Sequence, residues 1–202
     1  MTVTAFCKVA KIDYDYKHVS LPQGEQHSPV MKEINPQQYV PVLVEGDFKL
    51  YETTAILQYL ADSKNIDDHW YPKDPKKRAK VNQFMSWFYL GFRKLHEPII
   101  FYRVFAPKMN IPIKQWKLDY CENAYPGAMA GLERYLEANE YVAGDEMSIA
   151  DFYAISAVAG QRLFNYDRSG YPKVCAWYDK LVAIPEIAET LAVYDQFMPS
   201  NS

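Results

Sequence analysis

Residues 40–50 have the sequence VPVLVEGDFKL, and this stretch decides the first half of the fold. An apolar run from Val40 to Val44 is followed by Glu45-Gly46-Asp47, which favours a turn, and then by Phe48 to Leu50. Two short apolar runs joined by a turn that contains glycine are typical of a β-hairpin. Residues 54–60 come next, with apolar side chains at helical spacing, so the hairpin is predicted to lead directly into a helix.

Upstream of the hairpin the sequence predicts helical and extended segments in turn. Residues 2–11 carry apolar side chains at offsets of three and four, which indicates a helix. Residues 14–18 alternate between rings and charged side chains, which indicates a strand. Residues 29–34 form a short helix that ends at Asn35-Pro36. A helix that leads into a strand normally follows a parallel first strand, so we expect this chain to start inside its first helix, without that strand.

Downstream of the hairpin the sequence predicts helices alone. Asp74-Pro75 supplies a capping residue and a proline in the first turn, so a long helix is expected from there to about residue 106, with a kink near Pro98. The further helices are expected at residues 113–138 (interrupted or bent at Pro126), 148–164, 172–184 and 185–197. The predicted fold class is therefore an α/β domain followed by an all-helical domain of about five helices. The predicted boundaries are residues 1–64 for the first domain, 65–73 for a linker and 74–202 for the second domain.

The composition is that of a packed globular protein. The chain has 202 residues, 49% of them hydrophobic and 23% charged, with a net charge of −3. Basic residues are scattered, apart from a short cluster at residues 73–78 that we interpret as a solvated helix face. Neither nucleic acid nor an anionic membrane is therefore indicated as a partner. No apolar run approaches the roughly 20 residues of a membrane span.

The number and spacing of the cysteines and histidines indicate the cellular compartment of the protein and not a metal-binding site. Cys7, Cys121 and Cys175 are odd in number and far apart, and the four histidines show no metal-binding spacing. This pattern favours a reducing compartment and neither a disulfide framework nor a metal site. No signal-peptide pattern opens the chain. We expect a soluble, cytoplasmic protein without a metal, and an organelle is not excluded by the sequence.

Residues 24–60 resemble the glutathione-binding core of cytosolic glutathione transferases, above all those of the theta and delta classes. The resemblance is carried by a joint pattern: Asn35-Pro36, Val40-Pro41, the hairpin, Glu52-Thr53, residues 70–74 as an interdomain linker, and Ser148 to Asp151 as a helix-capping box. It implies a thioredoxin-like first domain and glutathione as substrate. It also implies a homodimer built from the last helix of the first domain and the long helices.

The resemblance gives roles to four residues of the predicted site. Val40-Pro41 is implied to be a cis bond that turns the Val40 backbone toward the cysteinyl unit of glutathione, as an added strand pairs with a sheet edge. Thr53 is expected to cap the helix that follows, whose free N–H groups would hold the γ-glutamyl carboxylate, while Glu52 holds the ammonium group. From the residues alone, a trans proline and an ordinary helix cap stay open as alternatives.

Other positions depart from the family pattern. Gln26 stands where theta and delta members often have a histidine, and Gln38 where a histidine or lysine often contacts the glycine carboxylate. An amide forms weaker hydrogen bonds than a charged group, so we expect weaker glutathione binding than in a typical member. The catalytic serine of these classes has no counterpart here, so no catalytic residue is assigned. Cys7 is interpreted as a small core residue rather than a nucleophile.

Two functions follow from the missing catalytic segment. In the first, the chain is an enzyme that conjugates the glutathione thiolate to apolar electrophiles, as in detoxification. The candidates for the acceptor site are aromatic residues of the long helix, for which core packing is the alternative: Trp87, Phe88, Phe101 and Tyr102. In the second, the chain is a non-catalytic, glutathione-transferase-like structural or docking subunit of a larger assembly. Catalysis stays open, and we take the enzyme as the first hypothesis.

Overall fold

The computed structural model describes residues 1–198. The first part of the chain folds into short helices around one hairpin: α1 (Thr2–Val9), the 3₁₀ turn η1 (Glu25–His27), α2 (Pro29–Ile34), β1 (Val42–Glu45), β2 (Phe48–Tyr51), α3 (Thr53–Ser63) and the 3₁₀ turn η2 (Asp68–Trp70). β1 and β2 are antiparallel, with Val42 opposite Tyr51, and Gly46 adopts the positive φ of 58° that the turn requires. The predicted hairpin and the helix after it are confirmed.

The second part is helical throughout the residues that the structure describes. A long rod contains α4 (Pro75–Trp87), the π-helical stretch η3 (Phe88–Arg93), α5 (Lys94–Ile100), a second π-helical stretch η4 (Phe101–Phe105) and α6 (Ala106–Lys108). It is followed by α7 (Gln115–Glu137), α8 (Ile149–Gly160) with η5 (Gln161–Phe164), α9 (Pro172–Val182), and α10 (Pro185–Leu191) with η6 (Ala192–Phe197). An α/β domain followed by about five helical rods is the predicted class, and it is confirmed.

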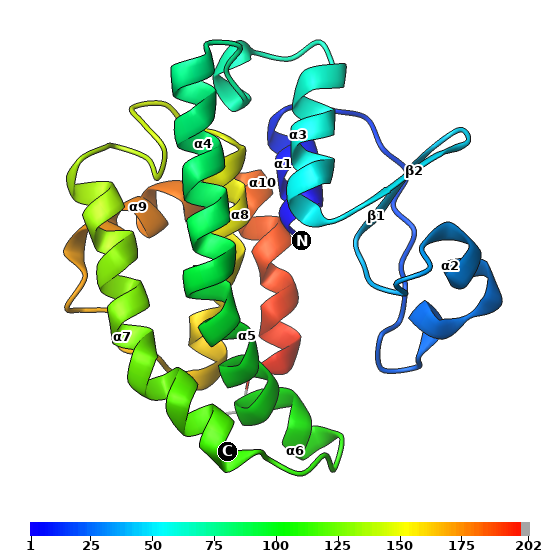
Figure 1. Cartoon of the computed structure of the whole chain (residues 1–202), viewed down its shortest axis with the longest axis vertical. Helices are drawn as coiled ribbons and strands as arrows, with labels where there is room; N and C mark the ends of the chain where they lie inside the picture. Colours follow the sequence, from blue (N-terminus) through cyan, green and yellow to red (C-terminus); the bar gives the residue numbers. More distant parts are fainter. Residues whose placement is uncertain (199–202) are drawn as a thin grey trace.

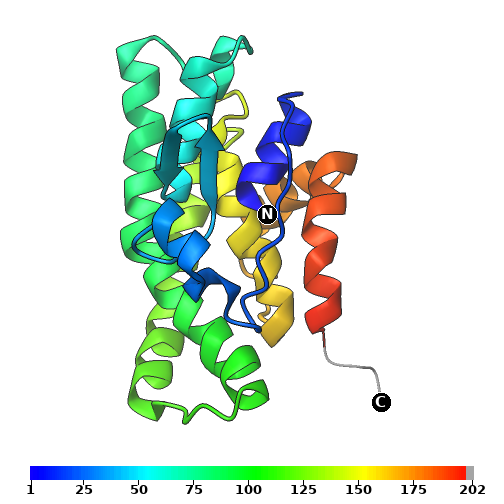
Figure 2. The same cartoon turned by 90° about the vertical axis from the view of Figure 1, so that its right-hand side faces the viewer.

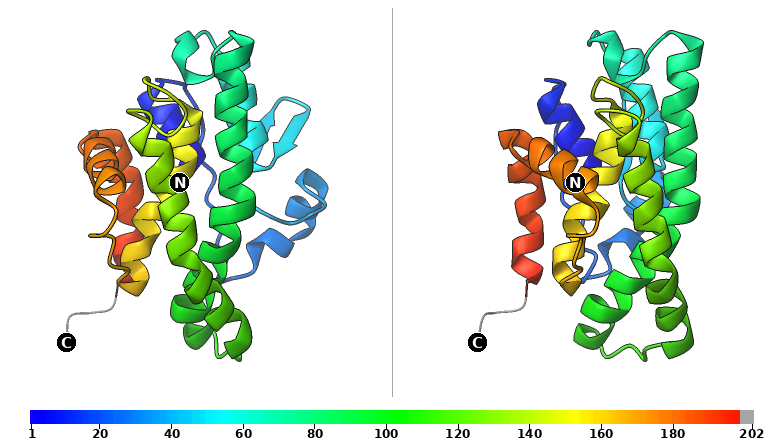
Figure 3. Two further views of the ribbon diagram at one scale, coloured as in Figure 1. Left: turned by 60° about the vertical axis from the view of Figure 1, so that its left-hand side comes forward. Right: turned by 90° about the vertical axis from the view of Figure 1, so that its left-hand side faces the viewer.

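The first domain lies against one side of the long rod. In Figure 1, α3 stands beside α4, and the hairpin and α2 project away from the helical domain. Figure 2 views the molecule from that side and shows the hairpin in front of α3, which contacts both strands. On the opposite side of the rod, α7 packs along α5 and against α9 (Figure 3). The hairpin domain and the helical domain thus meet along α3 and the rod.

Helix α8 is the centre of the core. Every one of its 12 residues is buried, and it contacts α1, α3, α4 and α9. The capping box predicted at its start is confirmed: the Ser148 side chain accepts from the first turn of the helix, and the Ser148 N–H donates to Asp151 Oδ2 at 2.9 Å. Asp151 also accepts from the Val142 N–H at 3.1 Å and from Trp177 Nε1 at 2.9 Å. This one carboxylate therefore ties α8 to α9 and to the loop before α8.

The strand predicted at residues 14–18 is wrong. Tyr14, Tyr16 and His18 lie in an extended but unpaired segment whose side chains are exposed, and the described part of the chain has one sheet, made of β1 and β2. An alternating pattern fits the pleat of a strand, but a strand also needs a neighbour for its backbone N–H and C=O groups. No described segment takes that place beside residues 13–18.

Two prolines lie inside helices of the second domain. Of the predicted interruption or bend at Pro126, the interruption is wrong, because α7 runs without a break from Gln115 to Glu137. Around Pro98 the rod stays helical, and its departures from α geometry are the two π-helical stretches on either side, η3 and η4. Each wider turn shifts the residues that follow around the helix axis.

Asp151 gives a prediction for the pH dependence of stability. Burial raises the pKa of this carboxyl to about 6, against the opposing effect of its hydrogen bonds. Between about pH 4 and pH 6 the native state keeps the proton that the unfolded chain releases, so the free energy of unfolding is expected to fall as pH rises through that window, by about 3 kcal/mol for two pKa units. Urea denaturation of wild type and Asp151→Asn across this range measures the effect. An equal slope in both proteins would contradict it.

Candidate functional site

A cavity of about 500 Å³ opens between the first domain and the long rod. The first domain contributes Tyr39, Val40, Pro41, Tyr51, Glu52 and Thr53 to its lining, and the helical domain contributes Tyr89, Arg93, Lys94, Glu97, Pro98 and Tyr153. Four of the six residues predicted to bind glutathione therefore line one cavity. The turn before β1 and the start of α3, which are about a dozen residues apart in sequence, are brought face to face by the hairpin.

The turn before β1 lines this cavity with Tyr39, Val40 and Pro41. The Val40-Pro41 bond is cis, as the resemblance implied. Pairing with β2 begins only at Val42, so the Val40 backbone lies outside the ladder, and its side chain is partly exposed. A main chain beside a cavity and free of sheet pairing can hydrogen-bond an extended ligand as an added strand would.

The start of α3 differs from the prediction in one detail. Glu52, not Thr53, is the N-cap residue, and the helix has no side-chain cap. Thr53 is already the first helical residue, so its hydroxyl comes one position too late to act as the cap. The Ile56 N–H is satisfied by the Glu52 carbonyl at 3.0 Å, whereas the preceding N–H groups of the first turn, from Thr53 to Ala55, lack an intrahelical partner. The result is an open, positive helix end at the cavity wall.

Glu52 has an unusual backbone conformation, with φ 73° and ψ 116°. Residues other than glycine rarely take positive φ, and a residue held there costs on the order of 1–3 kcal/mol. Such outliers gather at ligand sites because the surrounding structure must hold them in place. Here the residue in this conformation is the N-cap residue of α3, and it lines the cavity.

The opposite wall combines rings with a paired charge. Arg93 forms an ion pair with Glu97 one helical turn away, and its guanidinium lies 5.3 Å from the centre of the Tyr153 ring. Burial raises the pKa of the Tyr153 hydroxyl, which is therefore a neutral hydrogen-bonding group. Tyr89 extends this wall with an exposed ring. Such a wall can contact a flat apolar molecule and also donate hydrogen bonds to it.

The two glutamines of the predicted site lie together, but outside the lining. Gln26 Nε2 is 3.2 Å from His27 Nε2, and His27 Nδ1 is 2.9 Å from Gln38 Oε1. His27 thus bridges Gln26 and Gln38, and the two segments that flank α2 are joined through side chains. Gln26 lies in η1, before α2, and Gln38 lies in the segment that leads into Tyr39 and Val40; neither glutamine lines the cavity.

The aromatic acceptor candidates lie elsewhere on the rod. Trp87, Phe88, Phe101 and Tyr102 are absent from the cavity lining. Phe88 is fully buried and stacks on Phe84 and Phe92, while the Trp87 ring packs 4.8 Å from Tyr135. Core packing, the alternative interpretation, fits their positions. The rod residues that do line the cavity are spaced four apart (Tyr89, Arg93, Glu97), a signal that attention to aromatic residues alone missed.

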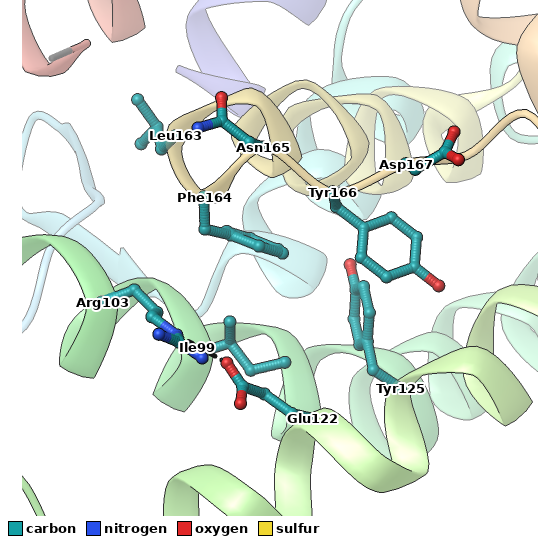
Figure 4. A pocket seen from close by; sticks show the side chains of 9 residues that line it. All are labelled: Ile99, Arg103, Glu122, Tyr125, Leu163, Phe164, Asn165, Tyr166 and Asp167. Carbon is teal, nitrogen blue, oxygen red and sulfur yellow. Dashed lines mark hydrogen bonds and ion pairs between the residues drawn. The ribbon is translucent and has the colours of Figure 1, made fainter.

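A second cavity, of about 570 Å³, lies within the helical domain (Figure 4). It is lined by Ile99, Arg103, Glu122, Tyr125, Leu163, Phe164, Asn165, Tyr166 and Asp167. The two cavities share no lining residue, and none of the predicted site residues reaches the second one. At its edge, Arg103 Nε donates to Glu122 Oε1 at 2.6 Å. It is therefore a feature separate from the interdomain cavity.

Other reactive groups are removed from the interdomain cavity. Cys7 is buried in α1, where burial raises the pKa of its thiol to about 11, so it is a core residue as predicted. Among residues 1–198, no three histidine, cysteine or acidic side chains are grouped as metal ligands would be. Within the same residues, no helix combines the length and hydrophobicity that crossing a bilayer requires.

A hairpin-containing first domain, an all-helical second domain and a cavity between them, with an open helix end in its wall, define a two-domain protein of the type predicted from the sequence. Residues 1–67 match the family model for the glutathione S-transferase N-terminal domain, and residues 93–185 match that for the C-terminal domain. The chain belongs to the glutathione S-transferase family. Its first domain is accordingly thioredoxin-like, as the resemblance implied.

Individual relatives agree with a theta-like assignment. The chain is 31% identical to glutathione S-transferase theta-1 of Bos taurus, over 88% of this chain and 75% of the relative. It is 34% identical to glutathione S-transferase T2 of Arabidopsis thaliana, but it spans only 32% of that protein's length. The human theta-class enzyme in complex with the glutathione conjugate of 1-menaphthyl sulfate superimposes with a TM-score of 0.87 at 26% identity, covering 97% of this chain and 84% of that one. These likenesses support a function of the glutathione transferase type.

The backbone of Glu52 gives a prediction about stability. Glycine tolerates positive φ better than glutamate, so Glu52→Gly is expected to leave the free energy of unfolding unchanged or raise it by about 1 kcal/mol. The matched control is Asp47→Gly in the neighbouring turn, where φ is not positive and where glycine is expected to cost about 0.5–1 kcal/mol through the flexibility of the unfolded chain. Urea midpoints measure both changes. Equal losses in the two variants would show that the backbone of Glu52 carries no strain.

Proposed function

We propose that this protein binds glutathione in the interdomain cavity and conjugates its thiolate to apolar electrophiles. One observation carries the proposal: Val40 and Pro41 before β1, and Glu52 and Thr53 at the open start of α3, line the same cavity. A tripeptide needs both kinds of contact, because its amides pair with a main chain while its terminal charges need partners of opposite sign. A related theta-class enzyme whose structure contains a glutathione conjugate supports glutathione as the ligand.

The match between the ligand and the wall can be stated group by group. The γ-glutamyl carboxylate would accept from the N–H groups of Thr53 and Thr54, at the positive end of α3. Its ammonium group would lie beside the Glu52 carboxylate, a charge-assisted contact. The cysteinyl unit would pair with the backbone of Val40. This arrangement directs the thiol toward the rod, where the electrophile would lie against the rings of Tyr89 and Tyr153 rather than against the four core aromatics.

Gln26 and Gln38 take a supporting role in this proposal. Their hydrogen bonds to His27 hold the segment from which Tyr39 and Val40 extend into the cavity. Neither residue supplies a positive charge for the glycine carboxylate of the tripeptide. We therefore keep the expectation that glutathione binds more weakly here than in a typical member of the family.

The second hypothesis, a non-catalytic structural or docking subunit, has an observation of its own in its favour. Residues 13–18 are extended and exposed, and no described segment pairs with them. An extended segment without a neighbour is a place where another chain can add a strand. We propose in either case two domains divided at residues 65–73, a cytoplasmic location, and a homodimer formed through α3 and the long helices.

Glutathione affinity tests the proposed site directly. Glu52→Gln keeps the size of the side chain but removes its charge, and losing a hydrogen bond to a charged group costs about 1.5–3 kcal/mol. The dissociation constant measured by calorimetry is therefore expected to rise about 10- to 100-fold. Glu33→Gln, an equal charge change on an exposed residue of α2 outside the cavity, is the control. Unchanged affinity in Glu52→Gln would remove the tripeptide from this cavity.

Turnover separates the two hypotheses. Free thiols have a pKa of about 8.5, so an enzyme must favour the thiolate to work at neutral pH. With glutathione and a chlorinated aromatic acceptor, the purified protein is expected to form conjugate faster than the buffer blank. A rate equal to the blank, together with measurable glutathione binding, would rule out conjugation of this acceptor by the chain. Co-purification at fixed stoichiometry in a large complex would then establish the docking subunit.

A further inference from the structure

The turn between α6 and α7 forms an exposed apolar end of the molecule. Four large side chains of this turn are open to solvent, with exposed fractions of 56% for Met109, 36% for Ile111, 45% for Ile113 and 72% for Trp116. Tyr120 follows Trp116 by one helical turn on the same face of α7 and is 65% exposed. Single exposed apolar residues are ordinary, but five large ones within the short segment from Met109 to Tyr120 make this end of the molecule a candidate interaction surface. We call residues 108–120 the tip.

The tip is a projection and not a groove. Figure 1 places the turn between α6 and α7 at one end of the long axis, at the opposite end of the rod from the start of α4, and Figure 3 shows the same from two other sides. Asn110 turns the chain at φ 52°, with its N–H bonded to the Pro107 carbonyl, and Leu118 buries its side chain to fix the start of α7. The apolar side chains are thus presented outward on a secured turn.

The charges of the tip are unlike those of the whole chain. Lys108, Lys114 and Lys117 lie within it against one acidic residue, Asp119, in a protein whose net charge is −3. Lys108 lies over the Phe197 ring at 5.8 Å, and the Asp119 carboxylate accepts from the Gln115 amide at 2.7 Å. Lysines thus outnumber acidic residues three to one in the segment that also carries the exposed apolar side chains.

We propose that the tip docks onto the surface of an anionic lipid bilayer. Tryptophan and tyrosine favour the headgroup region of a membrane, and lysines near the surface are attracted to anionic lipids. A protein partner fits this composition less well, because lysine is depleted at protein–protein interfaces. Trp116 and Ile113 enter the headgroup layer, and the lysines contact lipid phosphates and carboxylates. The protein lies on the membrane and does not span it, in agreement with the absence of a spanning helix among residues 1–198.

The proposal does not depend on glutathione binding, and it revises the expectation from sequence that no anionic membrane is a partner. That expectation rested on basic residues being scattered along the chain. In the structure, the segment that holds three of them also exposes five large apolar side chains, and this exposure is what the sequence did not reveal.

Vesicle sedimentation of the purified full chain tests the electrostatic part. We expect binding to vesicles of phosphatidylcholine mixed with phosphatidylserine, and much weaker binding to phosphatidylcholine alone. Since each lysine near an anionic surface contributes about 1 kcal/mol, Lys114→Gln combined with Lys117→Gln is expected to weaken binding about 30-fold. The matched control is Lys76→Gln with Lys77→Gln, an equal charge change on exposed residues at the other end of the rod. Equal losses in the two double variants, or no binding to the mixed vesicles, would overturn the proposal.

Tryptophan fluorescence tests the apolar part. Trp70 and Trp177 are buried, whereas Trp116 is the most exposed of the four tryptophans, so mixed vesicles are expected to shift the emission of wild type to shorter wavelength and to leave Trp116→Phe unshifted. Ile113→Ser with Trp116→Ser is expected to abolish sedimentation while the thermal midpoint stays unchanged. If these variants instead alter only the oligomeric state, as measured by analytical ultracentrifugation, and wild type does not sediment with vesicles, the tip is a contact between protein chains and the proposal fails.

Discussion

The buried position of α8 is the constraint on which the rest of the structure depends. This helix has no exposed residue, and it contacts α1 and α3 of the first domain as well as α4 and α9 of the second. Phe6 of α1 packs edge-on against both Trp70 and Phe152, with ring centroids 5.7 Å and 5.3 Å apart. The two domains are therefore joined by a shared aromatic core and not by a contact between two surfaces. Because α8 fixes α3 relative to the rod, it also fixes the distance between the two walls of the interdomain cavity.

The N-termini of α8 and α3 both have N–H groups without intrahelical partners, but the protein treats them differently. At α8, Ser148 and Asp151 satisfy the first N–H groups, and Asp151 is wholly buried, so this helix end is closed. At α3, no side chain caps the helix, and the residue before it, Glu52, is held at positive φ beside a cavity. An open helix end beside a cavity attracts an anion, whereas a closed one in the core adds only stability. The sequence motifs at the two starts look equally like caps, and only the structure distinguishes them.

The elements that could be predicted from the sequence are those marked by a residue with a specific local backbone preference. Prolines stand at the first position of α2, α4, α9 and α10, where the missing N–H costs nothing, and Gly46 marks the hairpin turn, so these elements were predictable. Residues 14–18 were not, because a strand depends on a neighbour that the alternation of side chains does not show. The cap of α3 was misplaced by one residue, from Glu52 to Thr53, since helix boundaries depend on backbone angles that neighbouring residues impose.

The aromatic candidates on the rod do not line the interdomain cavity, and the rod residues that do line it connect the fold with the two proposals. The rod residues that line the cavity are Tyr89, Arg93 and Glu97, at a spacing of four, with Lys94 and Pro98, whereas Phe88 is buried in the core. A helical spacing therefore marks the face of the rod that looks at the first domain, and a search for aromatic residues alone does not follow it. The same rod then continues to Lys108, where the tip begins roughly 15–20 Å beyond Glu97 at 1.5 Å per residue. Apolar electrophiles dissolve in lipid and therefore concentrate in a bilayer. If the tip rests on a bilayer, the interdomain cavity lies near that bilayer, at about the distance between Glu97 and the tip. The two proposals rest on separate residues, but one rod carries both the cavity residues and the start of the tip, and so fixes the distance between them.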